Sequence, residues 1–298
     1  SYREIGRVRV ILVITLIAAG SNAFLNWVFI YGHLGMPRLE VEGAAYATII
    51  AKTVEMLLLI GYTIKERPEF ISFSVFKRID WALFGRILKK GSLLIISQMM
   101  WVLSESFTAA IYNGRGNAAV VSGMAASFSI ANLFFISFDG ITTATGVLIG
   151  KSLGRNELDD ARKEKTWMLS AAIIFGCIMC LVGVVTVLLV PVVFGNLSID
   201  AQNICRAMLL LMALFMPLWI YVNTQLAVCR AGGDTKVGFL VDGGTTAVMI
   251  PMLLILAFFT NASPVMMYFG VKALDVGKII VATHEMKKER WVVNLSNA

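Results

Sequence analysis

Long, uninterrupted apolar segments constrain this chain more than any other feature. Of its 298 residues, 58% are hydrophobic and only 15% are charged, well outside the usual balance of a soluble domain. The apolar residues gather into runs of about twenty, the length that a helix needs to cross a bilayer. We therefore predict an all-α, polytopic membrane protein with about eight transmembrane helices, at residues 10–32, 43–64, 91–113, 118–150, 166–194, 204–229, 236–259 and 264–284.

The basic residues between these segments support the same topology. They are frequent in every second gap, as at 65–90 and 151–165, and sparse or absent in the others, as at 195–203 and 260–263. Loops rich in lysine and arginine stay on the cytoplasmic side of a membrane. The alternation predicts a multi-pass protein of the inner (plasma) membrane with both ends of this chain cytoplasmic. It also explains the net charge of +7 without a nucleic-acid partner.

A motif that occurs twice indicates a large internal repeat. Arg230-Ala-Gly-Gly-Asp-Thr-Lys236 leads into one apolar segment, and Arg3-Glu-Ile-Gly-Arg-Val-Arg9 leads into the first. Repeats of this size are typical of transporters built from two related halves. Four spans of the later repeat precede its motif and none precedes the first copy, so we expect this chain to lack the first four spans of a two-repeat protein. The expected parts are the last two helices of a first lobe at 1–64, a cytoplasmic amphipathic connector at 65–90, a complete six-helix second lobe at 91–284, and a cytoplasmic tail at 285–298.

Glu105 has no basic residue within one turn of its predicted helix. It lies ~21 Å along the helix axis from Gly91 at ~1.5 Å per residue, and therefore deep in the hydrocarbon region. Gln98, Trp101 and Thr108 share its helical face. Ionisable residues within membrane helices are costly and mark functional sites by default. We interpret Glu105 as the residue that binds the coupling cation, either H+ or Na+; the alternative is a protonated acid bonded to a neighbouring helix.

Two further ionisable pairs lie within predicted spans at a spacing of three residues. Lys52 with Glu55 and Asp275 with Lys278 each share one helical face. Opposite charges at this spacing neutralise one another, so we interpret both as structural intramembrane pairs. A role in proton transfer is the alternative.

The remaining polar residues of the spans are single. Asp139 precedes a glycine and is expected to interrupt its helix as a kink or a site, whereas Asp242 lies near the inner surface, where a lysine or water would serve it. Asn132 and Asn223 are amides of the kind that link helices in membranes. No metalloprotease motif, nucleophile elbow or phosphate-binding loop occurs in the sequence, so nothing in it predicts an enzyme.

Several sequence blocks resemble a known family. They are Leu25-Asn26 through Gly32, Pro37, Val41-Glu42-Gly43-Ala44-Ala45-Tyr46-Ala47-Thr48, Gly150-Lys-Ser-Leu-Gly154 with Ala161, and Arg230-Ala-Gly-Gly-Asp-Thr235. In this order they are similar to the multidrug and toxic compound extrusion (MATE) family, within the multidrug, oligosaccharide-lipid and polysaccharide exporter superfamily. The resemblance covers essentially the whole chain and implies helices five to twelve of a twelve-helix transporter in two six-helix lobes.

The resemblance also implies a function and several site residues. Members of the family export organic cations in exchange for Na+ or H+, so we expect secondary efflux by antiport, with Glu105 as the coupling residue and as a candidate ligand for Na+. A glutamate that some members carry in the seventh helix corresponds here to Trp101, one turn before Glu105, and an acid in the tenth helix corresponds to Trp219. The residues expected to line the cavity are Gln98, Trp101, Thr108, Asn132, Asp139, Trp219 and Asn223.

Two alternatives stay open at this point. One is a lipid-linked oligosaccharide or polysaccharide flippase of the same superfamily, which would need a basic cavity for pyrophosphate. The other is a truncated membrane protein that does not transport. We expect no cofactor apart from the coupling ion, organic cations and the lipid bilayer as partners, no nucleic acid, and a monomer.

Overall fold

The computed structural model describes residues 8–67 and 80–294, and every regular element in these ranges is a helix. The fold class predicted from the apolar runs is confirmed, and seven helices are long and apolar enough to cross a membrane. The chain divides into two compact units, Ser1–Asp80 and Trp81–Ala298. The helices are α1 Val8–Tyr31, α2 Glu40–Glu66, α3 Trp81–Arg115, α4 Ala118–Gly154, α5 Leu158–Val193, α6 Ile199–Ala231, α7 Lys236–Phe259, α8 Pro264–Ala273 and α9 Asp275–Lys287.

The first unit is a helical hairpin of α1 and α2. A tight turn joins them, in which Gly32 and Gly35 adopt positive φ angles of 75° and 80° that favour glycine. The backbones approach closely at Gly43 in α2, where an added Cβ would lie 2.7 Å from the carbonyl of Phe29. Small residues allow this kind of packing between membrane helices.

The predicted pair of Lys52 and Glu55 is present in this unit. The Lys52 ammonium lies 2.8 Å from a Glu55 carboxylate oxygen. Thr15 of α1 donates a hydrogen bond of 3.3 Å to the other Glu55 oxygen, so the pair is tied to the neighbouring helix.

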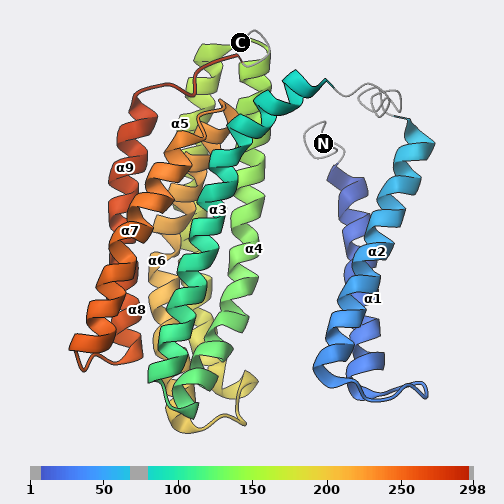
Figure 1. Ribbon diagram of the computed structural model, residues 1–298, viewed down its shortest axis with the longest axis vertical. Helices are drawn as coiled ribbons and strands as arrows, with labels where there is room; N and C mark the ends of the chain where they lie inside the picture. The colour runs from blue at the N-terminus through green and yellow to red at the C-terminus, as the bar shows by residue number, and fades with distance from the viewer. Residues whose placement is uncertain (1–7, 68–79, 295–298) are drawn as a thin grey trace. The chain divides into compact units, whose positions relative to one another are not determined.

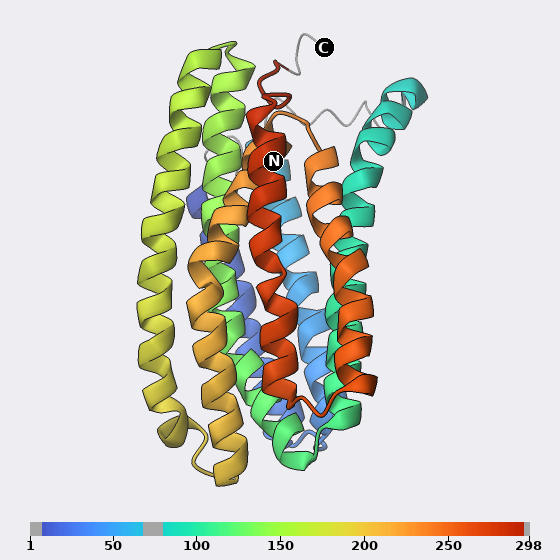
Figure 2. The ribbon, with the colours of Figure 1, turned by 90° about the vertical axis from the view of Figure 1, so that its left-hand side faces the viewer.

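In the second unit the helices lie along one common direction (Figures 1 and 2). Helix α6 is central and packs against α4, α5 and α9, while α3 packs against α7. Helices α5 and α6 approach closely, since a Cβ at Gly176 would lie 2.5 Å from Pro217 Cα and one at Gly183 would lie 2.7 Å from Ala213 Cβ. Because there is no side chain at these two glycines, α6 packs directly on the α5 backbone.

Two expectations about helix ends and breaks are wrong. Helix α3 continues through Gly91, where the connector was expected to end and the second lobe to begin, because one glycine costs only about 1 kcal/mol in a helix. Helix α4 is likewise unbroken at Asp139 and Gly140 over its 37 residues. Residues 68–79 of the predicted connector lie outside the described residues.

The last predicted span is divided. Helices α8 and α9 meet at Leu274, where Leu274 N donates to Val271 O and Gly277 N donates to Leu274 O. These are i to i−3 bonds, which tighten a helix locally and often mark functional positions. Leu274 itself keeps helical angles (φ −62°, ψ −23°), so the two helices continue in sequence rather than forming a loop.

The segment 288–294 after α9 packs over the ends of three helices, and we call it the C-terminal strap. Trp291 is only 1% exposed, and its indole donates to Met286 O. Glu289 receives Arg162 of α5 on both carboxylate oxygens, at 3.3 and 2.9 Å. A Cβ at Gly232, which follows α6, would lie 1.8 Å from Trp291 O. The strap therefore connects α9 to the ends of α5 and α6.

The strap gives a first prediction about pH. The Arg162 guanidinium holds the pKa of Glu289 below its usual range, mainly through their hydrogen bonds. A lowered carboxylate pKa stabilises the folded state above the ordinary value of about 4.3 and is lost as pH falls through the folded-state value. We expect hydrogen-exchange protection of 288–294 to be constant from about pH 8 to 5, and Glu289→Gln to lower it throughout that range. Asp160→Asn is the control, because Asp160 pairs with Lys163 on its own helix, and it should change nothing in the strap.

Candidate functional site

A cavity of ≈610 Å³ lies between the helices of the second unit. Its walls come from α3, α4, α6, α7, α8 and α9, and they combine aromatic rings with charged and amide groups. A space of this size is typical of sites for small molecules. Six of the seven residues expected to line a cavity do so: Gln98, Trp101, Asn132, Asp139, Trp219 and Asn223.

Thr108, the seventh of these residues, does not line the cavity. Its side chain is 4% exposed, and its hydroxyl donates to the carbonyl of Ser104 at 2.7 Å. A threonine hydroxyl in a helix commonly bonds to the carbonyl four residues earlier. The expectation that Thr108 lines the cavity was therefore wrong, although it lies three residues from Glu105.

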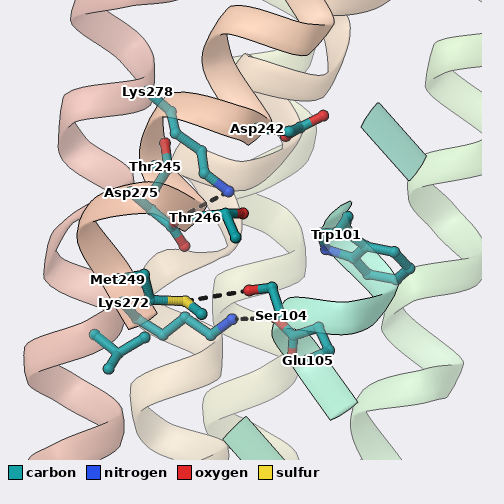
Figure 3. A pocket seen from close by; sticks show the side chains of 11 residues that line it. Trp101, Ser104, Glu105, Asp242, Thr245, Thr246, Met249, Lys272, Asp275 and Lys278 are labelled. Atoms are coloured by element: carbon teal, nitrogen blue, oxygen red, sulfur yellow. Dashed lines mark hydrogen bonds and ion pairs between the residues drawn. The ribbon is translucent and has the colours of Figure 1, made fainter. Parts of the chain in front are cut away.

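Glu105 lines the cavity but is not a lone carboxylate. Lys272 of α8 donates to Glu105 Oε1 at 2.7 Å (Figure 3). The Glu105 side chain is 32% exposed and the Lys272 side chain is 12% exposed. Sequence reasoning considered only cations within one turn of α3, and Lys272 is 167 positions away. It gave Lys272 no role in the site. The available signal was the series Lys272, Asp275 and Lys278, in which successive residues are three apart, because that spacing places neighbours of the series on one helical face.

The predicted pair of Asp275 and Lys278 is present and faces the same space. Lys278 Nζ lies 3.0 Å from Asp275 Oδ1, and the indole of Trp219 donates to Asp275 Oδ2 at 2.8 Å. A small void of ≈20 Å³ lies between these groups, Glu105 and Lys272, with Ser104, Thr245 and Thr246 also on its wall (Figure 3). That volume is about what one water molecule requires.

Asp242 has partners that the sequence did not indicate. Ser97 of α3 donates to Asp242 Oδ2 at 2.8 Å, where a lysine or water had been expected. Arg230, at the end of α6, also lines the cavity and interacts electrostatically with Asp242. Its Nε atom is buried and has no hydrogen-bond partner within the described ranges. The first residue of the repeated motif thus belongs to the cavity, which the sequence pattern by itself did not reveal.

Helix α4 contributes an acid beside aromatic rings. Asp139 is exposed in the cavity wall, and no ion pair involves it within residues 8–67 and 80–294. Phe135 and Phe138 lie next to each other at 5.5 Å between ring centres, and Phe135 contacts Trp219 edge-on at 6.1 Å. Asn132 lies two turns from Asp139 on the same helix. This wall offers a negative charge and π faces together.

Asn223 has a mainly structural contact. Its amide nitrogen donates to Trp219 O at 2.9 Å, one turn earlier in α6, which leaves its amide oxygen available to the cavity. The predicted link from Asn223 to another helix is not made through this nitrogen.

Two named relatives match most of this chain. A probable multidrug resistance protein NorM from Mesorhizobium japonicum is 26% identical over 291 residues, which make up 94% of this chain and 61% of that protein. A protein of the same name from Neisseria meningitidis serogroup B is 28% identical over 220 residues, 72% of this chain and 47% of that protein. The chain thus spans about three fifths or less of the length of these relatives.

Solved structures share the fold. A crystal structure of the Vibrio cholerae MATE transporter VcmN superposes with a TM-score of 0.78 at 17% identity and covers 98% of this chain and 65% of its own. A transporter of the MOP superfamily from Pyrococcus furiosus gives 0.75 at 18%, covering 93% and 62%. The MatE family model matches residues 94–255, more than half of the 298 residues. With the sequence blocks, the helical fold and this match agreeing, the chain belongs to the MatE family of multidrug and toxic compound extrusion proteins.

Proposed function

We propose that the protein of which this chain forms part is a secondary transporter that exports amphipathic organic cations by antiport with a cation. The observation that carries the proposal is the ≈610 Å³ cavity, in which Asp139 lies beside aromatic rings without a cation of its own in the described ranges. Aromatic faces and a carboxylate together suit an organic cation. The multidrug names of the relatives point in the same direction.

The proposed cycle moves two lobes against each other around a site at mid-membrane, as in other transporters built from repeats. Glu105, at the cavity wall, is the proposed coupling residue. The protein is proposed to be a monomer of the plasma membrane with both ends of this chain cytoplasmic, on the basis of the alternating basic loops. In this proposal the protein is not an enzyme, because the role of its cavity is to bind a substrate and to release it unchanged.

A flippase for pyrophosphate-linked substrates is supported less well. The cavity holds three basic side chains, Arg230, Lys272 and Lys278. Lys272 is paired with Glu105 and Lys278 with Asp275, and Arg230 interacts with Asp242. Each positive charge is thus matched by a carboxylate, so little is left to neutralise a pyrophosphate.

Transport of a fluorescent cation by the full-length protein in sealed vesicles tests the proposal. A gradient of H+ or Na+ should drive accumulation in vesicles that contain the protein, and collapse of that gradient by an ionophore should abolish it. Vesicles with the Glu105→Gln variant serve as the matched control. Indifference to both gradients would remove the antiport claim.

Asp139 is expected to select charge in the substrate. Asp139→Asn keeps the size of the side chain and removes its charge, so the KM for a cationic substrate should rise roughly tenfold, equivalent to about 1.4 kcal/mol. A neutral substrate of the same size should be transported with unchanged KM. Transport rates for the two substrates in the same vesicles provide the measurement. An equal effect on both would assign Asp139 to the structure of the wall instead.

A further inference from the structure

Glu105, the carboxylate expected to bind the coupling ion, is already paired with a positively charged side chain of the same protein. Lys272 Nζ lies 2.7 Å from Glu105 Oε1, a short, charge-assisted hydrogen bond. The ammonium therefore occupies a position that an incoming monovalent cation would need in order to reach this oxygen.

Lys272 is also held in place from other directions. Its ammonium lies 5.6 Å from the centre of the Trp219 ring and 5.5 Å from that of Tyr268, within the range of cation–π contacts. Its side chain is only 12% exposed. Tyr268, four residues earlier in α8, is 1% exposed and fixed by packing. The ammonium is thus positioned by one carboxylate and two aromatic faces.

With Lys272 in place, the carboxylate oxygens around Glu105 already have partners within the chain and are not free to form a Na+ site. A hard cation needs several oxygen ligands, often more than one carboxylate. Within residues 8–67 and 80–294 no group of three or more histidine, cysteine or acidic side chains is arranged to hold a metal ion. The other acids near the small void already have partners, since Asp275 binds Lys278 and the Trp219 indole, and Asp242 accepts from Ser97.

Charge balance leads to the same conclusion. The three carboxylates around the small void, Glu105, Asp242 and Asp275, face two lysines, Lys272 and Lys278. Arg230 supplies the third positive charge beside Asp242 in the larger cavity. Each of these three acids therefore has a neighbour of opposite sign without an added ion, while Asp139, the fourth acid of the larger cavity, is in no ion pair within residues 8–67 and 80–294. The buried hydroxyls of Tyr112 and Tyr268 are neutral groups of the same region.

We propose that the Lys272 ammonium is a resident cation that takes the place of an alkali metal ion at Glu105, so that this site exchanges protons and does not bind Na+. The proposal deepens the proposed function by naming the ion. A proton needs no shell of ligands, because it adds to a single Glu105 oxygen and breaks the ion pair with Lys272. The released ammonium then keeps its contacts with the Trp219 and Tyr268 rings and faces the same small void as Asp275, which stays paired with Lys278.

Binding of Na+ to the purified full-length protein tests the proposal without any transport. NaCl is titrated against choline chloride at constant ionic strength, and the readouts are thermal unfolding and tryptophan fluorescence, since the Trp219 ring contacts both Lys272 and Asp275. The wild-type curves in the two salts should superimpose. Lys272→Met, which keeps most of the length of the side chain but removes its charge, should gain a saturable response to Na+. At a Na+ concentration 100 times its Kd, the folded-to-unfolded ratio of this variant should rise about 100-fold.

The double variant Lys272→Met with Glu105→Gln is the matched control. It lacks both charges, so the gained response should disappear. A saturable response of the wild type to Na+ that Glu105→Gln removes would overturn the proposal, and this measurement decides even if Lys272→Met does not fold. Absence of a Na+ response in a folded Lys272→Met protein would also contradict it. Because no readout depends on efflux, a failure here is distinct from a failure of the proposed transport activity.

Discussion

Changing Glu105 to glutamine is expected to abolish gradient-driven efflux while the protein still inserts and binds its substrate. Glutamine keeps the volume and the hydrogen-bonding capacity of the side chain but removes its titratable charge. The carboxylate that takes up H+ and releases Lys272 is then absent, so transport against a gradient should fall at least tenfold. Glu105→Asp should give an intermediate loss, because its carboxylate is retracted by one methylene and reaches Lys272 less well. The measurement is efflux as a function of pH, normalised to the amount of inserted protein.

The ion pair adds a second way to lose function, which the experiment has to separate. Removing one partner of a buried pair leaves the other charge uncompensated and typically destabilises by 3–5 kcal/mol. The neutral double variant Glu105→Gln with Lys272→Met removes both charges, so no uncompensated charge is left to destabilise the protein. If Glu105 couples ion to substrate, the double variant should recover stability and remain inactive. If Glu105 only balances Lys272, both stability and efflux should return, and the coupling role would be excluded.

Gly176→Ala is expected to be among the most destabilising substitutions in the second unit. The added Cβ would lie 2.5 Å from Pro217 Cα, which is backbone and cannot rotate away. Helix α5 must then move from α6, and overpacking of this kind typically costs about 1–3 kcal/mol. Alanine is also a better helix former than glycine by about 1 kcal/mol, so the steric effect has to exceed this gain.

Gly146→Ala in α4 is the matched control. No atom lies within 4 Å of a Cβ at this position, so only the gain in helix propensity applies. We expect Gly146→Ala to be neutral or slightly stabilising, and Gly176→Ala to lower the thermal midpoint and the yield of monodisperse protein. Equal midpoints for the two variants would mean that α5 and α6 do not pack directly at Gly176.

Much of the fold follows from local features of the chain. The length of each apolar run against the thickness of a bilayer predicted seven helices that the structure contains as candidate spans. The pairs Lys52 with Glu55 and Asp275 with Lys278 were also predictable, because a spacing of three residues places two side chains together on any helix. The repeated motif and the sequence blocks were sufficient for the family.

Helix breaks were less predictable. Asp139 with Gly140 and the single Gly91 looked like interruptions, yet α4 and α3 continue through them, since neighbours in a packed bundle compensate for one weak helix former. The division at Leu274 left no mark in the hydrophobic pattern. Backbone hydrogen bonding at these points depends on surroundings that a local window does not contain.

The composition of the site was decided by tertiary structure. The sequence determined that Glu105 lies within a membrane helix and that it needs a partner or a function there. It did not determine that this partner is Lys272, nor that Arg230 and Asp242 line the same cavity, nor that Thr108 bonds to its own helix. Helical periodicity fixes which side chains share a face, but the rotation and register of α3 against α8 fix which faces meet. Glu105 and Lys272 are 167 positions apart, so only the packing of the helices brings these opposite charges together.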